Sequence, residues 1–123
     1  MEYADGNLKF KISPVYVEPE FNDYTTLTIQ NGTLMEPENT YWIKKGNLIY
    51  VNISGIRTND GATNVFITGL PTPANRVNDC MFSNMSTHCV GIFSDAYNNR
   101  FMTIPTGQVE QLYGHFVYIA KKE

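Results

Sequence analysis

Apolar and polar residues alternate along this chain with a period of two. Leu8, Phe10 and Ile12 alternate with lysines, and Ile49 to Ile53 repeat the pattern on one face of a later segment. Successive side chains of a β-strand point to opposite faces of its sheet, so the pattern predicts strands with one buried face and one solvated face. No segment shows the 3.6-residue apolar period of an amphipathic helix.

Turn residues separate the alternating segments. Asn31-Gly32, Lys45-Gly46-Asn47 and Asn59-Asp60-Gly61 interrupt the first half, and Asn98-Asn99 and Pro105-Thr106-Gly107 interrupt the second. Glycine adopts positive φ without a steric penalty, and asparagine tolerates the left-handed conformation. We expect the strongest hairpin at residues 45–47, since strand-like segments flank this turn on both sides.

The pattern predicts about eight short strands, with a ninth segment around Met81 and Met85 read as either a strand or a loop. The eight cover residues 8–12, 27–29, 41–44, 48–54, 65–67, 89–93, 100–104 and 113–120. Ser54-Gly55 is read as a strand end. Short strands at regular spacing without crossover helices indicate an all-β fold, an antiparallel β-sandwich of the jelly-roll type. A small closed barrel is the alternative.

The domain organisation follows from the same reading. Glu18-Pro19-Glu20 interrupts the pattern, so residues 1–20 are read as an N-terminal strand or a connector, and residues 21–123 as the sandwich domain. In the last segment, Val117 and Ile119 share one face and Phe116 and Tyr118 the other. A strand that is apolar on both faces is expected at the centre of a sheet or under a neighbouring subunit.

Composition narrows the class of protein. The chain has 123 residues, enough for one domain, and is 42% hydrophobic and only 17% charged, which argues against intrinsic disorder. The net charge is −3 and the lysines and arginines are scattered, so we expect no nucleic-acid partner. No segment approaches the ~20 apolar residues of a membrane-spanning helix. The first residues also lack the pattern of a signal peptide, so we expect no membrane insertion.

Side chains for catalysis or metal binding are sparse. His88 and His115 have no zinc-type spacing, and no nucleophile elbow, phosphate loop or dinucleotide motif is present. Glu36 and Glu38 resemble a glycosidase pair only in number, because no apolar residues surround them to raise a pKa. We expect no enzymatic activity, no cofactor and no metal. A calcium site is the alternative, built from the loop residues Asp60, Asp79 and Asp95.

Two cysteines, Cys80 and Cys89, are too few for a disulfide framework. We expect free, partly buried thiols, because unpaired cysteine often packs as a small hydrophobic residue. A single bridge between them is the alternative.

One expected hairpin tip combines the groups that bind a sugar. Asp95, Tyr97, Asn98, Asn99 and Arg100 supply an aromatic ring, two amides and two charged groups within six residues. A sugar ring has an apolar C–H face that stacks on aromatic side chains and a polar rim that binds amides and carboxylates. We therefore predict a saccharide site here, with an ordinary turn as the alternative.

Trp42 is the only tryptophan of the chain. We include it as a further stacking candidate for a sugar, and packing inside the sandwich or at a subunit contact is the alternative.

Four segments in a fixed order resemble the C-terminal receptor-binding, or tip, domains of phage tail-fibre and baseplate proteins. They read YWIKKGNLIYV (Tyr41–Val51), FITGLPTPA (Phe66–Ala74), IPTGQV (Ile104–Val109) and GHFVYIA (Gly114–Ala120), and the resemblance covers residues 24–120. It implies a β-sandwich that assembles as a homotrimer in the virion, joined to other tail or baseplate proteins. It also implies binding to a host cell-surface glycan or protein, but no shared binding residues.

We therefore expect a non-enzymatic domain that attaches a virion to a saccharide on the host surface. Two alternatives stay open. One is a structural virion module that only trimerises or decorates. The other is a carbohydrate-binding module, or a small glycan-cleaving domain, of a glycan-active enzyme.

Overall fold

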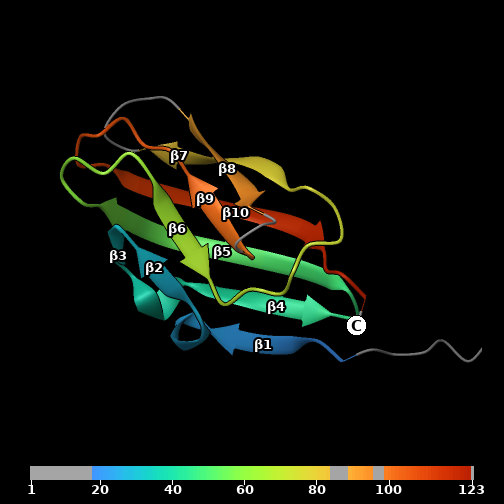
Figure 1. Cartoon of the computed structure of the whole chain (residues 1–123). Coiled ribbons are helices and arrows are strands. Elements are labelled where there is room, and N and C mark those ends of the chain that lie inside the picture. Colours follow the sequence, from blue (N-terminus) through green and yellow to red (C-terminus); the bar gives the residue numbers. More distant parts are fainter. Residues whose placement is uncertain (1–17, 84–88, 96–98, 123) are drawn as a thin grey trace, which may run out of the picture.

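Ten strands and two short 3-10 turns form the part of the chain that the computed structural model describes, residues 18–83, 89–95 and 99–122 (Figure 1). The strands are β1 (Glu20–Asp23), β2 (Thr28–Gln30), β3 (Gly32–Leu34), β4 (Tyr41–Lys45), β5 (Leu48–Thr58), β6 (Val65–Thr68), β7 (Asn78–Ser83), β8 (Cys89–Asp95), β9 (Arg100–Thr103) and β10 (Gln111–Ile119). The 3-10 turns are η1 (Tyr24–Thr26) and η2 (Pro37–Asn39). No helix within these ranges has the length and hydrophobicity needed to cross a membrane.

All strand pairs are antiparallel and belong to one sheet, in the order β1-β4-β5-β10-β7-β8-β9-β6-β2, with β3 beside the second half of β5. The sheet curls on itself, and Figure 1 shows β6 and β9 crossing in front of β5 and β10. Rings from the two halves meet in the interior. The Phe101 ring centroid, from β9, lies 5.2 Å from that of Phe116 and 5.2 Å from that of Tyr118, both on β10.

Because β9 and β10 are not neighbours in the sheet, these ring contacts cross between two layers. The all-β, antiparallel, sandwich-like prediction is therefore confirmed. Seven of the eight expected strands fall in the described ranges, where the structure has ten, and β1 and β3 were not expected. The outermost strands of the order, β1 and β2, do not pair with each other in the described ranges, so the alternative of a closed barrel is not adopted.

The hairpin predicted at residues 45–47 is present between β4 and β5. Lys45 pairs with Leu48, which leaves a two-residue loop, and Gly46 at its first position has φ 60°. Positive φ at the first loop position only is the pattern of a type II′ turn, whose twist matches that of the flanking strands.

The prediction that the strand ends at Ser54-Gly55 is wrong. β5 continues to Thr58, and its pairing with β10 shifts between Tyr113↔Ser54 and Leu112↔Ile56. Gly55 is the extra residue, so β5 carries a β-bulge here. The bulge returns Ile56 to the interior three positions after Ile53, and both are buried.

The segment near Met81 is a strand, β7. The expected boundary after residue 20 falls inside β1, which pairs with β4 from Glu20 onward. The strand expected at residues 8–12 lies outside the described residues, as does His88.

The last strand lies inside the sheet, between β5 and β7, as predicted. Its inward face is buried through Phe116 and Tyr118, but Val117 and Ile119 on the outward face are 52% and 51% exposed. The apolar outward face continues across the sheet. Tyr50 lies opposite Val117, Ile43 opposite Tyr50 and Phe21 opposite Ile43, so one row runs over four strands.

We expect the folded state to lose stability in alkali because of the buried phenol of Tyr118. Burial raises the pKa of its phenol above the ordinary range, and the hydroxyl donates a hydrogen bond of 2.7 Å to the Pro71 carbonyl. The folded state therefore favours the neutral phenol. This contribution is complete below pH about 10, the pKa of an unfolded tyrosine, and is lost as pH rises further, by up to about 1.4 kcal/mol per pH unit.

Urea unfolding at a series of alkaline pH values measures this slope. We expect Tyr118→Phe to decline less steeply with pH than the wild type, although it starts lower because it lacks the hydrogen bond to Pro71. Equal slopes would show that Tyr118 is not the responsible group.

Candidate functional site

A hollow of about 420 Å³ opens where β8 and β9 meet the loop that follows β6; we call it the β8–β9 hollow. The loop contributes residues 72–76, the strands contribute Phe93, Ser94, Asp95 and Met102, and Asn99 comes from the turn before β9. The volume falls in the range of small-molecule sites.

The floor of the β8–β9 hollow is apolar. Phe93 on β8 lies directly opposite Met102 on β9, and Pro73 and Ala74 come from the loop. This placement follows from the alternation in β8. Ile92 is buried, so its neighbour Phe93 faces outward, where it is half-buried.

An ion pair stands at the rim. Asp95 and Arg100 lie opposite each other across the β8–β9 hairpin, and Arg100 Nε donates to Asp95 Oδ2 at 3.1 Å. The Arg100 guanidinium also lies 3.7 Å from the centroid of the Phe66 ring, a cation–π contact. Two partners thus position Arg100, which in turn holds the Asp95 carboxylate beside the hollow.

Hydrogen bonds attach the loop to the two strands. The Thr72 hydroxyl donates to Asn99 Oδ1 at 2.8 Å, and the Val77 N–H donates to Ser94 Oγ at 2.9 Å. The Ser94 N–H returns a bond of 3.0 Å to the Val77 carbonyl. Asn99 itself has φ 50°, the left-handed conformation expected of it. The shape of the hollow is therefore held from both sides.

Of the predicted saccharide residues, Asp95 and Asn99 line this hollow, and Arg100 lies beside it, paired with Asp95. Tyr97 and Asn98 lie outside the described residues. Sequence reasoning missed Asn75 and Arg76, which reach the hollow from a loop that is distant along the chain. It also missed Phe93, although the alternation with Ile92 marks this ring as outward-facing.

Trp42 requires a correction as a stacking candidate. Its side chain is 7% exposed and belongs to the hydrophobic core, and its Nε1–H donates to Thr26 Oγ1 at 2.7 Å. A buried ring with its one donor already used offers no platform to a sugar. Trp42 instead packs inside the sandwich, as its alternative stated.

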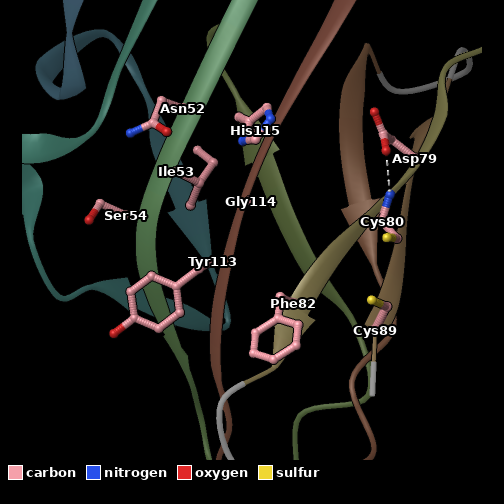
Figure 2. A pocket seen from close by; sticks show the side chains of 10 residues that line it. All are labelled: Asn52, Ile53, Ser54, Asp79, Cys80, Phe82, Cys89, Tyr113, Gly114 and His115. Carbon is pink, nitrogen blue, oxygen red and sulfur yellow. Dashed lines mark hydrogen bonds between the residues drawn. The ribbon is translucent and has the colours of Figure 1, made fainter. Parts of the chain in front are cut away.

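A second, more open hollow of about 490 Å³ lies over β5, β10, β7 and β8; we call it the β7–β10 hollow (Figure 2). Asn52, Ser54, Tyr113 and His115 line it from one side, and the two cysteines line it from the other.

Both cysteines are free and exposed, so the expectation of partial burial is wrong. The neighbouring Cys89 side chain raises the pKa of the Cys80 thiol, and desolvation and the charge of Asp79 act in the same direction. A raised pKa keeps Cys80 as the neutral thiol near neutral pH.

Glu36 lacks the environment expected of a glycosidase acid. Glu36 Oε1 accepts hydrogen bonds from Ser54 Oγ at 2.8 Å and Asn39 Nδ2 at 3.2 Å, and these bonds lower the pKa of Glu36. A general acid of a glycosidase needs the opposite shift. Within residues 18–83, 89–95 and 99–122, no three His, Cys, Asp or Glu side chains gather to hold a metal, which leaves the calcium alternative without a site there.

Glu110 is a buried carboxylate that the sequence does not signal. It is 2% exposed. Oε1 accepts from Ser83 Oγ at 2.9 Å, and Oε2 accepts from the Thr106 N–H at 3.0 Å and from its hydroxyl at 3.2 Å. The backbone of Glu110 pairs with Thr58 in both directions. This network joins the loop before β10 to β5 and β7, so Glu110 has a structural role.

Comparison with known proteins assigns no family, since no family model and no curated protein matches the chain. Its function is therefore inferred from its own fold, its surface hollows and its motifs.

Proposed function

We propose that this chain is a non-enzymatic saccharide-binding domain, the receptor-binding tip of a phage tail-fibre or baseplate protein, and that the β8–β9 hollow binds the host glycan. The observation that carries the proposal is the composition of this hollow. An apolar floor of Phe93 and Met102 lies beside the amides of Asn75 and Asn99 and the carboxylate of Asp95.

The two parts of the hollow match the two parts of a sugar. The C–H face of a pyranose packs on apolar and aromatic surface, and its hydroxyls exchange hydrogen bonds with planar amides and carboxylates. Prior ordering of the polar groups favours binding, because less side-chain entropy is lost when the ligand arrives. The Thr72–Asn99 hydrogen bond and the Asp95–Arg100 ion pair supply this ordering.

The virion setting is supported by the order of motifs and by the uncovered outer face. The row of Phe21, Ile43, Tyr50 and Val117 presents apolar surface that copies of the chain would cover in a homotrimer. Several linked sites raise the effective concentration, so weak binding to each sugar is enough for attachment. Under this proposal the domain works in the virion, with the host glycan, its own copies and other tail or baseplate proteins as partners.

Two substitutions test the saccharide site. Asn75→Ala removes one exposed amide. Asn99→Gly removes another but keeps a residue that tolerates the left-handed turn. We expect each to weaken binding about tenfold, equivalent to one lost hydrogen bond of about 1.4 kcal/mol. The measurement is a glycan array with the wild type, followed by calorimetry with the best ligand.

Asn59→Ala is the matched control, because Asn59 is an exposed asparagine in the turn after β5 and does not line the hollow. It should bind like the wild type. Unchanged affinity in both hollow variants would show that the saccharide does not bind in the β8–β9 hollow. A wild type that binds no saccharide would leave the structural virion module as the better proposal.

Light scattering tests the virion part separately. We expect a mass three times the 14.0 kDa of one chain. A monomer at every concentration would contradict the fibre-tip proposal but not the saccharide site.

A further inference from the structure

Cys80 and Cys89 face each other across neighbouring strands. The register pairs Cys80 with Gly91 and Cys89 with Phe82, so the two cysteines are diagonal neighbours on β7 and β8. Both are exposed and both line the β7–β10 hollow. Figure 2 shows the two sulfur atoms directed toward each other.

The two cysteines are close enough to form a disulfide after a small movement of the strands. Diagonal neighbours in an antiparallel pair have Cα atoms about 7–8 Å apart, and a relaxed disulfide needs about 4.4–6.8 Å. Part of β7 is held on one side only, because its pairing with β10 is limited to Phe82 and Ser83. Because Cys80 is already paired with Gly91, its separation from Cys89 lies mainly along the strands, and the segment carrying Cys80 can slide along β8 without breaking a ladder to β10.

A metal is a poorer occupant of this pair. Zinc sites need three or four protein ligands. No third His, Cys, Asp or Glu joins the two sulfurs among the residues that the structure describes. Two exposed thiols that face each other are better suited to exchange with a disulfide.

We propose that Cys80 and Cys89 are a modification site, at which exchange with a small-molecule disulfide such as oxidised glutathione forms a reversible cross-strand disulfide. One cysteine thiolate attacks a glutathione sulfur, forms a mixed disulfide and releases one reduced glutathione. The second cysteine thiolate attacks the protein sulfur of that mixed disulfide, forms the Cys80–Cys89 bond and releases the second glutathione. The protein loses two electrons and its two thiol protons, and glutathione disulfide gains both.

The bond is expected to be reversible at moderate redox potential. Structural disulfides have relaxed geometry and resist reduction by glutathione, whereas exposed bonds that require a shift of the backbone are more easily reduced. The site does not depend on the proposed function, because it lies on the β7–β10 hollow and not on the β8–β9 hollow.

Mass spectrometry of the folded chain tests the proposal. The wild type is equilibrated in buffers that differ in their ratio of oxidised to reduced glutathione, and the reaction is quenched with acid. The mass of the intact chain is then measured and its peptides are mapped. We expect the loss of two hydrogen atoms and a peptide that links Cys80 to Cys89 within one chain, reversed when reduced glutathione is restored. A chain that stays reduced in the most oxidising buffer, or carries glutathione on both cysteines, would overturn the proposal.

Two variants separate proximity from general reactivity. Cys89→Ser should stop at the mixed disulfide with one glutathione. Cys80→Ser combined with Asn78→Cys keeps two thiols on the same face but doubles their offset along the strands, since Asn78 pairs with Phe93. We expect at least a tenfold smaller equilibrium constant for closing this displaced pair. Equal closure of the displaced and native pairs would contradict the proposed geometry. All these positions are exposed, and circular dichroism checks that each variant folds.

Discussion

Gly69→Ala is expected to lower the free energy of unfolding by about 4 kcal/mol, the largest effect of any single substitution that we predict. A Cβ atom at this position would lie 2.0 Å from the Thr26 carbonyl oxygen, and Gly69 has φ 103°. Left-handed strain costs about 1–3 kcal/mol, and forcing backbone apart in a packed site costs about 1–3 kcal/mol more. Urea unfolding followed by the fluorescence of Trp42, the only tryptophan and a core residue, measures the loss.

Gly61→Ala is the matched control, because Gly61 also has positive φ, at 79°, but an added Cβ would meet nothing within 4 Å. We expect a loss of about 1 kcal/mol, from the strain alone. If the two alanine variants unfold at the same urea concentration, the close approach of Gly69 to Thr26 does not determine stability. The contact is relevant to the candidate site because Gly69 precedes the loop that forms one wall of the β8–β9 hollow.

Glu110→Ala is expected to cost about 3 kcal/mol. The substitution leaves the buried Ser83 hydroxyl, and the two donors of the exposed Thr106, without their acceptor. A buried donor that loses its partner costs about 1–3 kcal/mol, and bonds to charged acceptors are at the upper end of this range. The measurement is again urea unfolding at neutral pH.

Two further variants show how much of this loss comes from the buried hydrogen bonds of Glu110. Glu110→Gln keeps the shape and one carbonyl oxygen, so we expect an intermediate cost, because an NH₂ group then faces one set of donors. Glu38→Ala removes an exposed carboxylate and should change stability by less than about 0.5 kcal/mol. If Glu110→Ala lost no more than Glu38→Ala, the buried network would contribute nothing to stability.

Part of the candidate site is predictable from the sequence. Asp95, Asn99 and Arg100 fall within six positions around one turn, so any hairpin there brings them together. Asn75 and Phe93 are separated by eighteen positions (93 − 75), and only the folding of the loop against β8 unites them. Local turn chemistry predicts the first group, whereas the second depends on packing between distant segments.

The burial of Trp42 and of Glu110 also depends on residues that are distant in the sequence, so the sequence alone did not predict it. Tryptophan has both an apolar body and a donor, so sequence alone leaves it open between core and ligand site. Its burial here depends on Thr26, which accepts the indole N–H from a 3-10 turn outside β4. Glutamate is ordinarily exposed, and nothing near Glu110 in the sequence indicates that Ser83 supplies a buried donor.

The sequence by itself determined local properties of this protein: most of its strands, the apolar face of each of these, and most of the positions where the chain turns. These depend on neighbouring residues, because alternation and turn conformation are set within a few positions. Only the tertiary structure decided that β10 lies between β5 and β7, that Gly55 forms a bulge, and that Cys80 and Cys89 meet. Pairing between distant strands depends on the sum of many weak side-chain contacts, and no local pattern of residues contains that sum.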